Sequence, residues 1–158
     1  NELNNYLNIP KKDFILFNGR NHPEKQPELF RKLAKVLTER YEAKYQKENP
    51  YLFILTCDNN FTKNEYYGIL SQAKAVVSFA LQENFGYGIA EAAYLGCIPV
   101  VPNRLVYPEF YPEECLYNSY EEAVEMVWNI METDPEPFKF NRMQDGNLGS
   151  IHTWFKQY

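Results

Sequence analysis

Short apolar runs without regular polar alternation recur along the chain, separated by longer polar-apolar segments. Runs of this kind, bounded by turn residues, are typical of strands that are buried on both faces. We therefore predict buried strands at Phe14–Phe17, Tyr51–Thr56, Ala75–Phe79 and Ile98–Val101 and a very short strand at Leu116–Tyr117.

Between these runs, apolar residues recur at helical spacing and predict amphipathic helices. The inward stripes are Leu29, Leu33, Leu37 and Tyr41 after Pro23, then Tyr66, Ile69, Leu70 and Ala73, and finally Tyr120, Ala123, Val124, Val127, Trp128 and Met131. Thr62 with Glu65 and Ser119 with Glu122 have the spacing of helix N-terminal caps. A short helix is predicted over Gly86–Leu95, with Gly96 just past its end. The C-terminal part, about 136–158, is predicted to be irregular and helical.

Alternating strands and helices indicate an α/β fold, a Rossmann-like parallel sheet with helices on both faces. With 158 residues, the chain is long enough for one domain with a real core, and we interpret residues 1–158 as a single domain. In such sheets, ligands bind beyond the carboxyl ends of the strands. The loops that follow the first three strands are therefore the candidate site.

Composition narrows the function classes further. An apolar content of 45% argues against disorder, and a net charge of −5 argues against a nucleic-acid surface covering the domain. Cys57, Cys97 and Cys115 show neither a disulfide framework nor zinc spacing, which favours a reducing, cytoplasmic setting. His22 and His152 have no partner at metal spacing, and no apolar run is long enough to span a membrane.

The loop after the first strand carries Arg20 and Lys25. A guanidinium offers a planar fork to phosphate oxygens, and an ammonium offers a mobile point charge. Since Arg20 leaves the strand and Lys25 enters the following helix, both cations can reach one rim. The alternative is an ordinary solvated loop.

The loop after the third strand carries Glu83, with Glu91 eight positions later. The intervening Phe85-Gly86-Tyr87 leads into a helix N-terminus, where backbone amides and the helix dipole favour an anion. Glu91, in the second turn, can accept hydrogen bonds from a ribose diol. Both glutamates could instead be solvent-facing acids that favour the helix dipole.

The loop after the second strand ends at Phe61. Its ring could form a wall against a flat base. It could equally pack as a hydrophobic staple on the following helix.

Taken together, Gly19-Arg20, Glu24-Lys25 and the stretch "ENFGYGIAEAAYLGCIPVV" resemble the C-terminal, donor-binding domain of retaining GT-B-fold glycosyltransferases. This group is similar to glycogen synthase and bacterial α-mannosyltransferases. The E-x7-E signature of the family matches Glu83 and Glu91, and its Arg-x4-Lys pair matches Arg20 and Lys25. The resemblance covers about residues 13–133, and "TWFKQY" resembles the closing helix of the family.

The resemblance implies roles for individual residues. As catalytic residues it implies Glu83, which would contact the donor sugar, and Arg20 and Lys25, which would neutralise the diphosphate. Glu91 would hold the ribose hydroxyls. The other donor-binding residues would be Asn84, Phe85, Gly86, Tyr87, Gly19 and Phe61. No metal or other cofactor is expected, because the cations and the helix N-terminus would stabilise the leaving group.

The resemblance also implies partners. The substrate would be a nucleotide-sugar, linked to UDP or GDP, and the chain would be the half of an enzyme that lacks its N-terminal acceptor domain. The isolated chain would then bind donor without transferring the hexose. Only one strand fits between Tyr51 and Phe61, where the family has a further strand and helix.

Residues 105–117, "LVYPEFYPEECLY", are similar to a stretch of the glycosyltransferases that modify queuosine in transfer RNA. The acceptor itself stays open, with a nucleic acid among the candidates. The alternative function is a non-catalytic module that binds a nucleotide or nucleotide-sugar.

Overall fold

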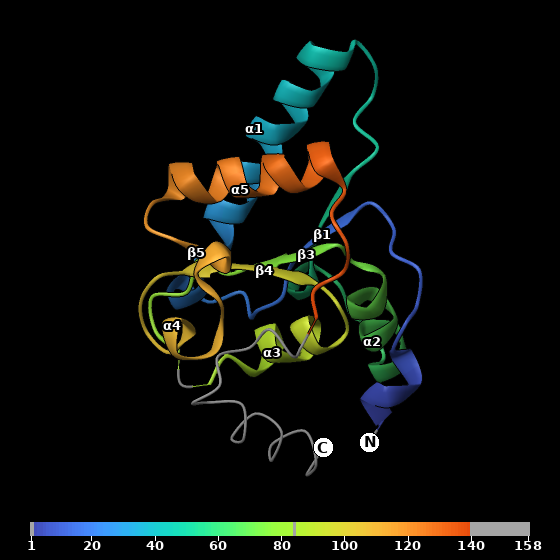
Figure 1. Cartoon of the computed structure of the whole chain (residues 1–158), viewed down its shortest axis with the longest axis vertical. Helices are drawn as coiled ribbons and strands as arrows, with labels where there is room; N and C mark the ends of the chain where they lie inside the picture. The colour runs from blue at the N-terminus through green and yellow to red at the C-terminus, as the bar shows by residue number, and fades with distance from the viewer. Residues whose placement is uncertain (1, 84, 140–158) are drawn as a thin grey trace.

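The computed structural model describes residues 2–83 and 85–139, which form one parallel sheet between two layers of helices (Figure 1). The strand order is β2-β1-β3-β4-β5, and every neighbouring pair is parallel. The strands are β1 (Phe14–Phe17), β2 (Leu52–Leu55), β3 (Ala75–Val77), β4 (Ile98–Pro102) and β5 (Leu116–Tyr117). The predicted Rossmann-like α/β class is confirmed.

The helices divide between the two faces of this sheet. In Figure 1, α1 and α5 lie above the sheet, and α2, α3 and α4 lie below it. The α-helices are α1 (Pro27–Tyr45), α2 (Lys63–Gln72), α3 (Tyr87–Tyr94), α4 (Tyr107–Phe110) and α5 (Tyr120–Thr133). Four short 3-10 turns among the described residues are η1 (Glu2–Tyr6), η2 (Pro23–Lys25), η3 (Thr56–Asp58) and η4 (Glu113–Cys115).

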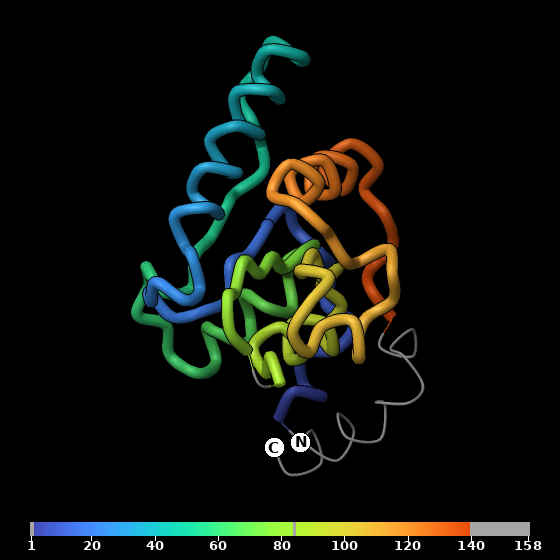
Figure 2. The backbone as a smooth tube through the Cα atoms, turned by 90° about the vertical axis from the view of Figure 1, so that its left-hand side faces the viewer, coloured from blue at the N-terminus to red at the C-terminus, as the bar shows by residue number. Residues whose placement is uncertain are grey.

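Each face of the sheet has its own apolar core. Phe30, Leu33 and Leu37 of α1 are fully buried in the core that also contains Ile15 and Val127. Burying side chains of this size contributes roughly 1.5–3 kcal/mol each, which fixes α1 and α5 on this face. Figure 2 shows that the C-terminal end of α1 extends beyond the sheet.

The prediction that the second strand is buried is wrong. β2 lies at the edge of the sheet, because β1 pairs with both β2 and β3. Leu52 is 55% exposed, and only Leu55 in this strand is buried. An apolar run shows that a strand forms but does not show whether it has one neighbour or two.

The segment before α1 also differs from the prediction. Lys25 does not enter the long helix but ends the short turn η2, and Gln26 follows with a φ of 52°. The next residue is Pro27, and a residue that precedes proline is disfavoured in the α conformation. This break turns Lys25 toward the carboxyl end of the sheet.

The remaining helix boundaries follow local capping chemistry. Thr62 and Glu65 form the predicted reciprocal capping box of α2, and the Ser119 hydroxyl accepts from the Glu122 amide at the start of α5. Gly96, just past the end of α3, has a φ of 98°, as predicted for a left-handed C-terminal residue.

Lys11 joins the C-terminal ends of two helices. Its ammonium donates to the carbonyls of Ser71 (2.8 Å) and Leu95 (2.7 Å), at the ends of α2 and α3. A cation is favourable at these partially negative helix ends. Burial lowers the pKa of Lys11. α3 is thus anchored at the end opposite to the candidate site.

The predicted C-terminal helical part is not confirmed where it can be seen. Residues 136–139 form no helix, and the Phe138 amide donates to the Gly96 carbonyl (2.9 Å). Pro135 and Pro137 have no amide hydrogen to continue α5. The rest of this part, with "TWFKQY", lies outside the described residues.

Candidate functional site

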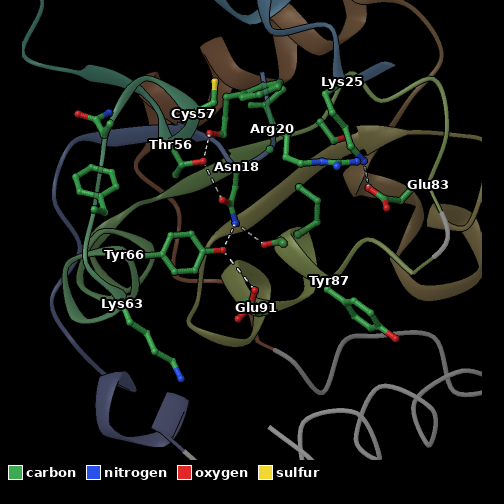
Figure 3. Close-up of a pocket in the computed structure, with 18 of the residues that line it drawn as sticks. Asn18, Arg20, Lys25, Thr56, Cys57, Lys63, Tyr66, Glu83, Tyr87 and Glu91 are labelled. Atoms are coloured by element: carbon green, nitrogen blue, oxygen red, sulfur yellow. Dashed lines mark hydrogen bonds and ion pairs between the residues drawn. The ribbon is translucent and has the colours of Figure 1, made fainter. Parts of the chain in front are cut away.

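A cavity of about 690 Å³ opens at the carboxyl ends of β1, β2 and β3 (Figure 3). The chain leaves β1 through α1 on one face of the sheet and leaves β2 through α2 on the other. β1 and β3 are therefore the point at which the strand order reverses, where parallel sheets bind ligands.

Most of the predicted site residues meet in this cavity. The members of its lining that the sequence predicted are Gly19, Arg20, Lys25, Phe61, Glu83, Tyr87 and Glu91. Gly86 caps α3 but is not part of the lining, and Phe85 lines a neighbouring cavity instead. Asn84 lies outside the described residues.

Lys25 and Glu83 form an ion pair between the loops after β1 and β3. Their charged atoms are 2.8 Å apart, and the two side chains are 17% and 21% exposed. The same loops are joined by hydrogen bonds from the Leu81 amide to the Glu24 carbonyl (2.7 Å) and from the Gln26 amide group to the Phe79 carbonyl (2.8 Å). A cation and a carboxylate therefore share the rim, while the exposed Arg20 lines the cavity beside them.

Glu91 reaches the same cavity from α3 and is only 6% exposed. The Tyr66 hydroxyl donates to its carboxylate over 3.4 Å. Burial, and next the charge of Glu91, raise the pKa of Tyr66 well above its ordinary value. The phenol therefore keeps its proton and acts as a donor. The interpretation of Glu91 as a solvent-facing acid is wrong.

Asn18, Thr56 and Tyr66 belong to the site although the sequence did not single them out for it. The Asn18 amide donates to the Tyr66 hydroxyl and to the Gly88 carbonyl, both at 2.9 Å, and accepts from the Thr56 hydroxyl at 3.1 Å. Figure 3 shows these dashed contacts converging on Asn18. Their position in the sequence could have indicated this role for two of them, because Asn18 and Thr56 directly follow β1 and β2.

The first turn of α3 adds backbone to the cavity. Gly86 caps the helix with a φ of 65°, a left-handed conformation that glycine adopts without steric cost. Tyr87 and Gly88, the first residues of the helix, line the cavity. The positive end of the helix dipole thus lies in the same space as Arg20 and Lys25.

A second, shallower cavity of about 720 Å³ shares Glu83 and Tyr87 with the first. Its other lining residues are Phe85, Leu105, Val106, Glu109 and Phe110. The rings of Phe85 and Tyr87 are stacked, with centroids 5.3 Å apart and planes 8° apart. Glu83 therefore stands between a cationic cavity and an aromatic, acidic one.

Two of the three cysteines, Cys97 and Cys115, are buried away from the first cavity, and the third, Cys57, is part of its lining. Burial raises the pKa of Cys97 to about 11 and that of Cys115 to about 12, so both thiols stay protonated. Cys57 lines the first cavity as a free thiol.

In the part of the chain that the structure describes, no three His, Cys, Asp or Glu side chains gather to hold a metal ion. No helix there is long and apolar enough to cross a bilayer.

Comparison with known proteins supports the resemblance stated above. The chain is 40% identical over 82 residues to the tRNA-queuosine alpha-mannosyltransferase of Drosophila melanogaster. That alignment covers 52% of this chain and 22% of the relative, so the chain spans about a fifth of the length of the relative that it matches. No family model matches the chain.

The fold is similar to the catalytic domain of cholesterol-alpha-glucosyltransferase from Helicobacter pylori. The TM-score is 0.56 at 18% identity, over 89% of this chain and 98% of that one. Both similar proteins are glycosyltransferases by name. The two names and the fold agree with the recognition, from the sequence, of a GT-B glycosyltransferase C-terminal domain.

Proposed function

We propose that this chain is the donor-binding domain of a retaining glycosyltransferase that takes a hexose from a nucleotide-diphospho-sugar. The observation that carries the proposal is the cavity at the β1–β3 switch point, which gathers three cations (Arg20, Lys25 and Lys63), two carboxylates and a helix N-terminus. A diphosphate flanked by two sugars presents complementary groups, with negative charge in the middle and hydroxyls on either side.

The diphosphate would lie beside Arg20 and Lys25 at the start of α3. Arg20 would donate two parallel hydrogen bonds to phosphate oxygens, and Lys25 would contribute a point charge. Because Lys25 is paired with Glu83, phosphate must share or replace that partner. As the donor bond breaks, the same cations and the helix amides would stabilise the nucleoside diphosphate that leaves.

The nucleoside would extend toward Glu91 and α2. The Glu91 carboxylate would accept hydrogen bonds from both ribose hydroxyls, because a carboxylate has acceptor sites for two donors. Phe61 and Thr62 line this side of the cavity, at the start of α2. Phe61 would offer a ring to the base, which is uracil or guanine in this proposal.

The transferred sugar would extend the other way, to Glu83. Glu83 would contact its hydroxyls at the border of the second cavity, which would then receive acceptor groups. Among the residues that the structure describes, the lining of that cavity includes Glu83 and Glu109 but no Lys, Arg or His. A neutral or cationic part of the acceptor therefore fits this surface better than a phosphate.

The acceptor domain would belong to a longer protein, since the chain spans 22% of its Drosophila relative. The name of that relative makes a queuosine nucleoside in transfer RNA the acceptor to test first. We propose that the transfer needs no metal and that the isolated chain binds donor without turnover, because two domains must exclude water and align the acceptor.

Calorimetric titration of the purified chain with UDP, GDP and the two nucleosides tests the proposal. One diphosphate should saturate the chain, its nucleoside should bind much more weakly, and EDTA should change neither result. If nucleoside and diphosphate bind alike, the phosphate site is misplaced. Multiple-turnover transfer by the isolated chain would contradict the half-enzyme proposal.

A further inference from the structure

We propose that Asn18 and Tyr66 are positioning residues that hold the Glu91 carboxylate and the first turn of α3, and thereby set a preference for ribose over deoxyribose. This inference rests on the proposed function, since it takes Glu91 to be the group that receives the ribose diol. Asn18 and Tyr66 are not part of the E-x7-E or Arg-x4-Lys spacings, so the inference adds two residues to the candidate site. They act through Glu91 rather than through the phosphates.

The orientation of the Asn18 amide is determined by its neighbours. The Gly88 carbonyl can only accept a hydrogen bond, so the NH2 group of Asn18 must face it, at 2.9 Å. The second hydrogen of that group goes to the Tyr66 hydroxyl, and the Thr56 hydroxyl donates to the amide oxygen. The fixed amide links the end of β1 to β2, α2 and α3.

Tyr66 connects the fixed Asn18 amide to the Glu91 carboxylate through two hydrogen bonds. Its hydroxyl accepts from Asn18 at 2.9 Å, so its own proton is directed to the Glu91 carboxylate at 3.4 Å. Because the phenol comes from α2 and the carboxylate from α3, the contact also sets the separation of the two helices across the cavity. Glu91 would thus meet a ligand with its position already fixed.

The absence of a side chain at Gly88 allows this arrangement. A Cβ atom there would lie 3.2 Å from both the amide nitrogen and the backbone carbonyl of Asn18. Such contacts are tighter than ordinary van der Waals packing. The close approach of α3 to the end of β1 therefore depends on the same residue whose carbonyl Asn18 binds.

Tyr66→Phe removes the hydroxyl and keeps the ring, so the fold should be retained. The measurement is the affinity ratio between the preferred nucleoside diphosphate, UDP or GDP, and its 2′-deoxy analogue. The parent should favour the ribose form, and the variant should narrow this ratio by about two- to tenfold, the worth of one hydrogen bond. Tyr94→Phe removes a hydroxyl from α3, the helix that carries Glu91, at a position outside the cavity, and should leave the ratio unchanged.

A second comparison distinguishes positioning from direct contact. In a Glu91→Gln background, Tyr66→Phe should change the ratio little further, because both variants act on one interaction. Thr56→Val, which frees the amide oxygen of Asn18, should narrow the ratio in the parent by less than Tyr66→Phe. The melting temperature of each variant is measured alongside.

An unchanged ratio in Tyr66→Phe overturns the inference while leaving the donor-binding proposal intact. One form of this outcome is an equal loss of affinity for the ribose and deoxyribose ligands, because Tyr66 would then act directly on a part of the ligand that both share. Failure of the parent to bind either diphosphate is a different result, since it overturns the proposed function and with it the role given to Glu91.

Discussion

Glu83 and Glu91 line the same cavity, but the protein holds them in different ways. Glu91 is on a helix, is 6% exposed and contacts a phenol that is itself fixed by Asn18. Glu83 is on a loop, and its partner is the flexible ammonium of Lys25. In the proposed function, the side that would receive the nucleoside is thus built before ligand arrives, while the side that would receive the phosphates and the sugar can exchange partners.

This difference matches what each side would have to do. A ribose diol keeps its structure through the reaction, so a fixed acceptor for it costs nothing when the bond breaks. Charge at the diphosphate increases in the transition state, and a cation that can leave Glu83 for phosphate responds to that change. The comparison therefore predicts opposite effects when the two carboxylates are neutralised.

The largest effect is expected on the fixed side. Glu91→Gln keeps the shape and the acceptor for Tyr66 but weakens two charge-assisted hydrogen bonds, which should cost on the order of 1–3 kcal/mol of diphosphate affinity. Calorimetry with the nucleoside diphosphate measures the loss. Glu121→Gln, at an exposed position in α5, is the matched control. An affinity equal to that of the parent would remove Glu91 from the site.

The next effect concerns the backbone between the two glutamates. Gly86→Ala places a Cβ in a left-handed conformation, which should cost roughly 1–2 kcal/mol of stability. The Cβ would also lie 3.2 Å from the Tyr107 ring. Gly68→Ala is the control in α2, because its Cβ meets nothing within 4 Å and should stabilise the helix by about 0.5–1 kcal/mol. Chemical denaturation should show a lower free energy of unfolding for Gly86→Ala and a higher one for Gly68→Ala.

On the adjustable side, Lys25→Ala should weaken the diphosphate by roughly 1 kcal/mol, less than Glu91→Gln, because Glu83 already neutralises part of its charge. Binding of the nucleoside should not change, and Lys35→Ala, exposed in α1, should have no effect. Titrations with both ligands test this. A parallel loss of nucleoside affinity would place Lys25 at the wrong end of the ligand.

Much of the fold followed from local patterns. Uninterrupted apolar runs located β1 and β4, and the Thr62-Glu65 capping box located the start of α2. The edge position of β2 could not be read from its sequence, because strand order depends on which faces the connecting helices cover. Strand pairing is a property of the whole chain.

The site was predicted where chemistry depends on charged residues at fixed spacing, as with Glu83 and Glu91. Asn18, Thr56 and Tyr66 were not assigned to it, because the role of an amide or a hydroxyl depends on its hydrogen-bond partners, which here are far away in the sequence. Tyr66 was expected to face the core as part of an apolar stripe. The structure confirms that Tyr66 packs against the core, and it also places the residue in the cavity lining, since a phenol has an apolar body and a polar tip.

The smallest expected effect is also the one that separates the two carboxylates most clearly. Glu83→Gln removes the negative charge 2.8 Å from Lys25 and leaves the ammonium to interact with phosphate alone. A partly exposed ion pair is worth up to about 1 kcal/mol, so affinity for the nucleoside diphosphate should rise by about two- to fivefold. The gain should shrink in high salt, which screens the added attraction. In a protein that also carries the proposed acceptor domain, the same variant should lose sugar transfer, because the proposed contact of the Glu83 carboxylate to the hexose would be weakened. Lower diphosphate affinity in Glu83→Gln would show that Glu83 supports the bound ligand as Glu91 does, and that the two sides of the cavity do not differ in the way argued above.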